Sequence, residues 1–152
     1  MAKLFIDCEQ GDFSALADAV YKVLGQTDDL MAEIITVSAD EIRELNNSTR
    51  GIDKVTDVLS YPTLEGIRGK VVLKKDFPCD VDDGKLMIGS IVLCLERIKE
   101  QAVEIGHSEQ DEREYLIVHG LMHLFGYDHM TDDDKKQMRE KEKAVMALLG
   151  KN

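Results

Sequence analysis

The sequence has few cysteines, and their spacing does not suit a disulfide framework or a cysteine-based metal site. Only three occur in 152 residues, and no two of them form a CxxC pair: Cys8, Cys79 and Cys94. An odd number without close spacing argues against disulfide cross-linking. We therefore expect reduced thiols that are mostly buried, as free cysteines usually are.

Long hydrophobic runs are also missing. No apolar stretch approaches the roughly 20 residues that cross a bilayer. The N-terminal segment MAKLFIDCEQGD reaches acidic residues after one short apolar patch, which is too short for a secretory signal. These absences argue against a membrane protein, and we expect a cytoplasmic one.

Basic residues are too few to balance the acidic ones. The chain has 19 Lys and Arg against 30 Asp and Glu, a formal net charge of −11. A duplex would repel such a protein overall, which argues against nonspecific coating of nucleic acid. Residues 43–75 nevertheless carry seven basic and four acidic side chains, a net +3 that leaves −14 for the remainder. This segment permits a phosphate-bearing partner, although scattered solvated lysines would give the same composition.

Helical and strand-like patterns follow one another without strict alternation. We see no internal repeat, low-complexity tract or linker, so we expect residues 1–152 to form a single domain. Strand-like patterns occupy residues 3–7, 30–38, 56–61, 69–75 and 85–95, and helical patterns occupy 12–25, 39–47, 96–106, 109–125 and 131–150. This arrangement predicts an α+β fold, a mixed β-sheet with helices packed against it.

Acidic residues open the last predicted helix. Thr131 suits the N-cap position, and Asp132 to Asp134 would face the positive end of the helix dipole. Three consecutive aspartates also suit a metal site, but the capping role is the interpretation we favour.

Three of the four histidines lie within the segment HGLMHLFGYDH, residues 119–129. In an α-helix His119 and His123 are about 40° apart on one face. His129 would be rotated about 240° from His123 and lie about 9 Å further along an unbroken helix. Gly126 removes this difficulty, because glycine readily adopts the left-handed conformation that ends helices. We therefore expect the loop after Gly126 to return His129 to the other two.

Three imidazoles on a helix and its exit loop are typical of a catalytic zinc site, which leaves one position for water. We expect one Zn²⁺ per chain, held by His119, His123 and His129. A structural zinc site usually has four ligands with cysteines among them, and no cysteine is near. His107 precedes the helix and is interpreted as a surface residue. The apolar residues between the ligands are expected in the core: Leu121, Met122, Leu124 and Phe125.

The spacing HxxxHxxGxxH is also that of the metzincin proteases, whose motif reads HExxHxxGxxH. Their glutamate is the general base, and Gly120 occupies that position here. Loss of such a base costs about 10²–10⁴-fold in rate. The metal geometry is therefore predicted to persist without the protease chemistry.

HGLMHLFGYDH closely resembles the HGxLHLxGYDH signature of the YbeY family of bacterial endoribonucleases and rRNA maturation factors. RGIDKVTDVLSYP, residues 50–62, is similar to the family's RGxDxxTDVLSFP segment, and IGSIVLC, residues 88–94, also fits. The resemblance implies an α+β fold, zinc on the three histidines, and cleavage of single-stranded RNA in small-subunit rRNA maturation and ribosome quality control. It also implies the ribosomal small subunit and an associated GTPase as partners. Ser90 departs from the family pattern, which has aspartate there.

The resemblance makes Arg50 the candidate catalytic residue beside the metal. Its guanidinium suits the charge that develops on a phosphorane. Lys54, Asp57 and Ser60 are candidate substrate contacts. Asp128 is expected either to orient a ligand imidazole or to cap the final helix.

Two alternatives remain open at this point. One is a zinc hydrolase of peptides or amides, which the metzincin spacing suggests. The other is a noncatalytic factor that binds rRNA or assembling ribosomes and uses zinc to hold its C-terminal helices. The general base, the natural RNA and the oligomeric state are not specified by the sequence.

Overall fold

The computed structural model describes residues 2–151, and a mixed β-sheet forms its centre. The strands are β1 (Leu4–Asp7), β2 (Leu30–Thr36), β3 (Val58–Pro62), β4 (Val81–Asp82) and β5 (Lys85–Leu93). They lie in the order β1-β2-β5-β3, with β4 paired to the start of β5. β1, β2 and β5 are parallel, whereas β3 and β4 run antiparallel to β5. The central strand β5 therefore joins the parallel and antiparallel halves.

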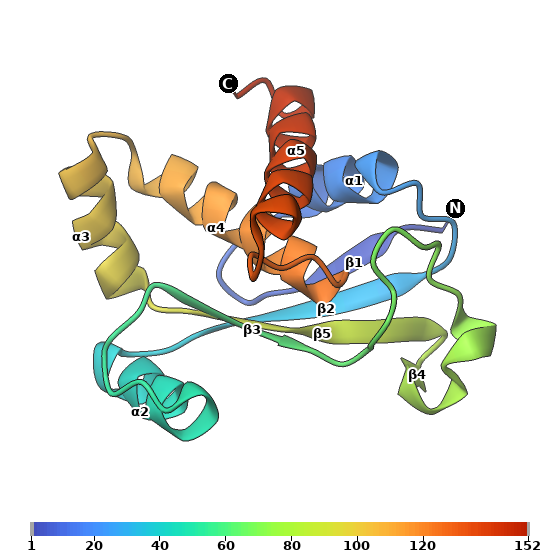
Figure 1. The fold of residues 1–152 in the computed structure, drawn as a ribbon, viewed down its shortest axis with the longest axis horizontal. Coiled ribbons are helices and arrows are strands. Elements are labelled where there is room, and N and C mark those ends of the chain that lie inside the picture. The colour runs from blue at the N-terminus through green and yellow to red at the C-terminus, as the bar shows by residue number, and fades with distance from the viewer. Residues whose placement is uncertain (1, 152) are drawn as a thin grey trace.

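Helices cover both faces of this sheet unequally (Figure 1). They are α1 (Ser14–Val23), α2 (Ala39–Arg50), α3 (Leu95–Ile105), α4 (Glu109–Leu124) and α5 (Asp132–Leu148). α1, α4 and α5 lie on one face, and α2 lies on the other. The mixed sheet with packed helices confirms the predicted α+β fold.

Local capping signals start three of these helices where the sequence places them. The Ser38 side chain accepts from the backbone of Glu41, and the Glu41 carboxylate accepts from the backbone of Ser38, a complete capping box. Ser108 caps α4 through the amide of Asp111. Thr131 and Asp134 form a second capping box at α5, which confirms the capping role of the aspartate run.

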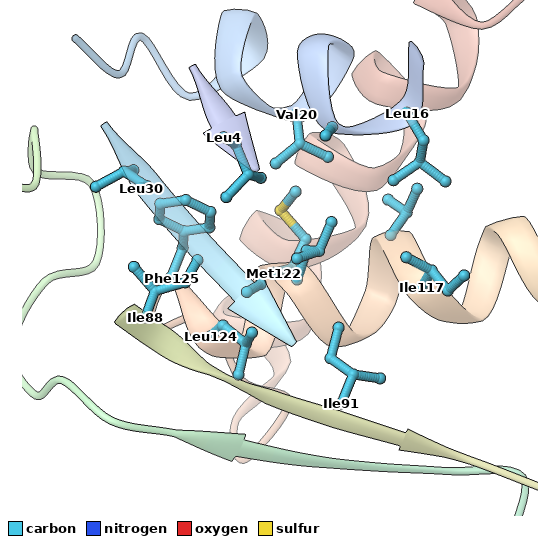
Figure 2. Packing of buried hydrophobic residues seen from close by; sticks show 14 of the residues in the cluster. Leu4, Leu16, Val20, Leu30, Ile88, Ile91, Ile117, Met122, Leu124 and Phe125 are labelled. Carbon is cyan, nitrogen blue, oxygen red and sulfur yellow. The ribbon is translucent and has the colours of Figure 1, made fainter. Parts of the chain in front are cut away.

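The main core lies between the sheet and the helices α1, α4 and α5. At the end of α4, Leu124 and Phe125 point toward the sheet, where Ile88 and Ile91 lie, whereas Met122 points toward α1 (Figure 2). All five side chains are buried. Leu121 is buried as well, so the predicted core residues of the histidine segment are confirmed. This packing holds the end of α4 firmly against the sheet.

The prediction of a strand at residues 69–75 is wrong, because its backbone bonds to side chains instead of a neighbouring strand. The amide of Val72 donates to Oε1 of Gln26 at 2.8 Å, and Gln26 Nε2 donates to the Lys70 carbonyl at 3.0 Å. The amide of Lys74 donates to Oδ2 of Asp28 at 2.8 Å. The segment then turns into the 3₁₀ helices Lys74–Asp76 and Pro78–Asp80. The short strand β4 follows them.

The cysteines are free, as expected, but only one is fully buried. Cys94 is buried, Cys8 is partly buried and Cys79 is exposed, so the expectation of mostly buried thiols is wrong. Cys79 lies in the 3₁₀ helix Pro78–Asp80. Within residues 2–151, no helix has both the length and the hydrophobicity needed to cross a membrane.

Candidate metal centre

The end of α4 and the loop after it bring the three clustered histidines together. One ring nitrogen from each of His119, His123 and His129 lies within 4.8 Å of the others. His119 and His123 stand edge to face with their ring centres 4.7 Å apart. The His129 ring centre lies 5.1 Å from that of His123 and 6.0 Å from that of His119. The chain reversal expected after the helix therefore places the third imidazole beside the first two.

Gly126 makes this reversal. Its φ of 95° lies in the left-handed region, which ordinary side chains rarely adopt. The amide of Gly126 donates to the His123 carbonyl, and the amide of Tyr127 donates to the Met122 carbonyl, both at 3.0 Å. A Cβ on Gly126 would lie 3.0 Å from the backbone nitrogen of Arg68. Glycine is therefore required here both by the turn and by a neighbouring segment.

The outer nitrogens of two imidazoles have defined acceptors. Nδ1 of His119 lies 2.6 Å from Oε2 of Glu142, and Nδ1 of His123 lies 3.0 Å from the Tyr127 carbonyl oxygen. A carbonyl only accepts, so His123 carries a proton on Nδ1. The carboxylate of Glu142 likewise selects the Nδ1–H form of His119. In the neutral imidazoles both Nε2 atoms are then unprotonated.

These two unprotonated nitrogens face each other. Nε2 of His119 and Nε2 of His123 are 3.2 Å apart, with a lone pair on each when the rings are neutral. Zinc–imidazole bonds of about 2.0–2.1 Å in a tetrahedron would place ligand nitrogens about 3.3 Å apart. A shared cation between them replaces lone-pair repulsion by two bonds. The donor set and its spacing therefore fit a metal ion that prefers imidazole.

Burial favours the neutral form of the central ligand. Desolvation, followed by the charges that His119 and His129 would carry, lowers the pKa of His123 to about 4. Its imidazole is therefore neutral at pH 7, which is the form that binds metals.

Glu142 is the residue that sequence reasoning missed in this site. Its side chain is buried, and it accepts from Tyr115 Oη at 3.3 Å as well as from His119. Metal-binding histidines usually hold such a carboxylate on their second ring nitrogen. One signal was available: Glu142 shares the buried face of α5 with Met138 and Val145, at helical spacing. A carboxylate on an apolar stripe indicates a specific buried partner.

Arg68 is the second residue that the sequence did not reveal. Its Nε donates to the Gly126 carbonyl at 2.9 Å, and its two terminal nitrogens bond Asp128 and Asp134 at 2.7 Å each. One guanidinium therefore joins the loop that carries His129 to the first turn of α5. This fork geometry is particular to arginine.

Asp128 forms an ion pair with Arg68. Its Oδ2 accepts from Arg68, and its Oδ1 accepts from the amide of Met130 at 3.2 Å. Within residues 2–151 no hydrogen bond joins Asp128 to an imidazole. The carboxylate found on a ligand ring is that of Glu142.

Arg50 and Lys54 lie in and after the last turn of α2. Both are exposed, and Nη1 of Arg50 donates to Asn46 Oδ1 at 3.4 Å. Nδ2 of the buried Asn46 donates to the Lys54 carbonyl at 3.0 Å, which fixes the loop while leaving the ammonium group outside. Neither cation has an ion pair among the described residues. Their roles toward substrate remain predictions.

Asp57 and Ser60 belong to the β3 region. Oδ2 of Asp57 accepts from Gln101 Nε2 at 2.9 Å, and its Oδ1 accepts from the amide of Val58 at 2.7 Å. These bonds tie the start of β3 to α3. Ser60 pairs with Ile91 across the sheet. Substrate contact by either residue stays a prediction.

Ser90, the departure from the family pattern, lies on β5 beside β2. Its Oγ donates to Oε1 of Glu33 at 3.3 Å. An aspartate at this position would place a second carboxylate against Glu33. Serine replaces that repulsion by a hydrogen bond.

Gly120, which replaces the metzincin glutamate, faces the sheet. A Cβ there would lie 2.9 Å from Cδ1 of Ile91 and 3.2 Å from both its Cγ1 and its Cγ2. Ile91 is fully buried. The position therefore has no room for a general base directed at the metal, which argues against a peptidase of that mechanism.

His107 stays outside the cluster, as expected. It is exposed, and its Nε2 lies 3.4 Å from a carboxylate oxygen of Glu112. Within the described part of the chain, the group of residues able to share one ion consists of the other three histidines.

Comparison with known proteins identifies the family of this chain. The family model described as Endoribonuclease YbeY matches residues 6–150. The chain belongs to the YbeY family. The resemblance drawn from its two motifs is therefore confirmed.

Individual relatives match across most of the YbeY-type chain. The Endoribonuclease YbeY of Clostridium perfringens (strain SM101 / Type A) is 40% identical, covering 96% of this chain and 96% of its own. That of Clostridium acetobutylicum is 42% identical, covering 91% of this chain and 86% of its own. The solution structure of TM1509 from Thermotoga maritima is 30% identical, with a TM-score of 0.59 over 99% of this chain and 90% of that one.

Proposed function

We propose that this protein is a zinc-dependent endoribonuclease that cleaves single-stranded RNA, acting in small-subunit rRNA maturation and ribosome quality control. The observation that carries the proposal is the pair of unprotonated Nε2 atoms, 3.2 Å apart, with His129 beside them. The relatives named Endoribonuclease YbeY supply the substrate class. The ribosomal small subunit, an associated GTPase and a cytoplasmic location complete the proposal.

The protein's own side chains prepare the site for this chemistry. The Glu142 carboxylate and the Tyr127 carbonyl hold two imidazoles in the tautomer that directs Nε2 inward. Zinc bound there would lower the pKa of a water and polarise a phosphoryl oxygen. Arg50, exposed and without a carboxylate partner among residues 2–151, is available to a phosphate. Its guanidinium would offset the negative charge that develops at phosphorus.

Two observations weigh against the alternatives. Gly120 packs against Ile91 and leaves no place for a peptidase base. The loop carrying His129 is already held by Arg68 through the Gly126 carbonyl, Asp128 and Asp134. Because these bonds of Arg68 already tie the loop to α5, a purely structural zinc would have little left to stabilise. A catalytic ion is the better explanation.

The first experiment measures zinc content and RNA cleavage together. His119→Ala and His123→Ala should each lose stoichiometric zinc and cleavage of a single-stranded oligoribonucleotide. Arg50→Ala should keep zinc and lose most cleavage, by a factor of about 10² or more. Lys99 on α3 provides a control, since it is exposed and has no ion pair among residues 2–151, and Lys99→Ala should keep both zinc and cleavage.

Two further results would contradict the proposal. One is stoichiometric zinc retained by the His119→Ala/His123→Ala double variant. The other is hydrolysis of casein with no hydrolysis of RNA. Chelation distinguishes the remaining alternative, since loss of a structural ion would unfold the protein and loss of a catalytic one would mainly abolish cleavage. Sedimentation with small ribosomal subunits tests the proposed partner.

A further inference from the structure

A groove lies between α4 and α5, beside the carboxylate that holds His119. Its volume is about 890 Å³, at the upper end of the range for small-molecule sites. Glu142, whose carboxylate holds His119, forms part of its wall. Tyr115 of α4 and Met146 of α5 supply apolar surface. We call this hollow the α4–α5 groove.

Tyr115 gives the groove a flat aromatic wall next to the metal centre. Its side chain is 39% exposed although large and hydrophobic. The ring lies 6.2 Å from the His119 ring, centre to centre, with 28° between their planes. Its hydroxyl donates to Glu142 at 3.3 Å, which fixes the ring orientation. An oriented, partly exposed ring is a surface on which a nucleobase can stack.

Cations line the other side of the groove. Arg139 and Lys143 are exposed, one turn apart on α5, and neither has an ion pair among the described residues. Lys135 lies one turn before Arg139, and a second hollow of about 410 Å³ continues along these three residues. Successive cations of this row are separated by about 6 Å along the helix.

The two acidic residues that line the α4–α5 groove itself are paired or buried, whereas Asp132 and Glu140 are exposed in the second hollow. Lys151 pairs with both Asp111 and Glu114 of α4. Glu142 is 6% exposed and bonds His119 and Tyr115. In a chain of net charge −11, a row of unpaired cations beside an aromatic wall is locally complementary to a polyanion with flat, stackable groups.

We propose that the α4–α5 groove binds the nucleotides of single-stranded RNA next to the phosphate at the metal centre. One base stacks on Tyr115, and the adjoining phosphates contact Arg139 and Lys143. This proposal rests on the proposed function, which supplies RNA as substrate. It adds a strand path along α5, separate from the basic segment at residues 43–75.

The stacking contact is tested by binding, without any need for cleavage. A fluorescent 2′-O-methyl oligoribonucleotide is titrated with the zinc-loaded protein, and two variants of Tyr115 are compared. Tyr115→Ala should weaken binding by about 5- to 100-fold, the range for loss of one stacked base. Tyr115→Phe keeps the ring and removes only the hydroxyl bond to Glu142, so its affinity should stay within about twofold of the parent.

The phosphate contacts are tested by the salt dependence of the same titration. Arg139→Gln and Lys143→Gln should each weaken binding and reduce the slope of log K against log salt by about 0.7. Lys99→Gln on α3 removes an equally exposed charge away from the groove and should leave the slope unchanged. Zinc content and circular dichroism confirm that the variants are folded and loaded.

Three outcomes would overturn the proposal. Parental affinity in Tyr115→Ala would show that no base stacks there, and equal salt slopes for the groove and control variants would show that no phosphate lies along α5. An equal loss in Tyr115→Phe and Tyr115→Ala would assign Tyr115 to positioning Glu142 instead. A parent protein that binds RNA through the groove without ever cleaving it would contradict the proposed nuclease alone.

Discussion

Nδ1 of His119 lies 2.6 Å from Oε2 of Glu142, and this hydrogen bond joins α4 to α5 at the metal centre. Glu142 is buried and also accepts from Tyr115. A buried carboxylate on the far side of an imidazole raises the basicity of the nitrogen that faces the ion. This contact links the candidate metal centre to the packing of the last helix.

Removing the charge of Glu142 should weaken metal binding. Glu142→Gln keeps an oxygen that can accept from His119, but it loses the negative charge, and zinc affinity should fall about 10- to 100-fold. Competition with a chromophoric chelator measures the zinc affinity of each variant. Glu140→Gln is the matched control, because Glu140 is exposed on the same helix. Equal affinity in the two variants would exclude a role for the Glu142 charge.

Gly126→Ala should cost more stability than the same change at another left-handed glycine. Replacing either Gly126 (φ 95°) or Gly106 (φ 90°) by alanine should lower the free energy of unfolding by about 1–2 kcal/mol, because alanine disfavours the left-handed backbone. A Cβ added to Gly126 would lie 3.0 Å from the backbone nitrogen of Arg68, whereas a Cβ added to Gly106 would have no atom within 4 Å. Urea unfolding should therefore show a larger loss for Gly126→Ala, together with weaker zinc binding. Equal losses would contradict the close contact.

Gly120→Ala should be destabilising because of Ile91. Alanine gains about 1 kcal/mol of helix propensity over glycine. Overpacking against Ile91, 2.9 Å from the new methyl group, costs about 1–3 kcal/mol. Ile91→Val removes that closest carbon, so Gly120→Ala should be nearly neutral in the Ile91→Val background. A double-mutant cycle of unfolding free energies measures this, and additive effects would refute the contact.

Acid should weaken the clamp formed by Arg68. Hydrogen bonding to Arg68, then to Thr131, lowers the pKa of Asp134 to about 2, against about 3.9 for an unfolded aspartate. The lowered pKa stabilises the folded state above about pH 4, and this contribution is lost as the pH falls from about 4 to about 2. The stability difference between the parent and Asp134→Asn should therefore be constant near neutral pH and shrink in that window.

Asp132→Asn is the control for the acid titration. It removes a charge from the same helix turn, and within residues 2–151 Asp132 makes no ion pair with Arg68. Its stability difference should stay small throughout. A difference for Asp134→Asn that persists unchanged to pH 2 would mean that the ion pair does not stabilise the fold.

Features set by neighbouring residues could be predicted from the sequence. The two imidazoles one turn apart, the glycine that ends α4 and the caps Ser108 and Thr131 all depend on fewer than a dozen consecutive residues. Backbone sterics and helix geometry operate over that range. The convergence of His129 on the other two rings therefore follows from the order of residues alone.

Only the tertiary structure decided which distant groups complete the site. Glu142 reaches His119 across 23 residues, and Arg68 reaches the Gly126 carbonyl across 58. Residues 69–75 resemble a strand because of their short Val-Val-Leu run, but the side chains of Gln26 and Asp28 are the hydrogen-bond partners of their backbone. A local pattern of apolar residues predicts which face of a helix or strand must be buried. The pattern does not specify which other element packs on that face, because many distant segments could bury the same apolar surface.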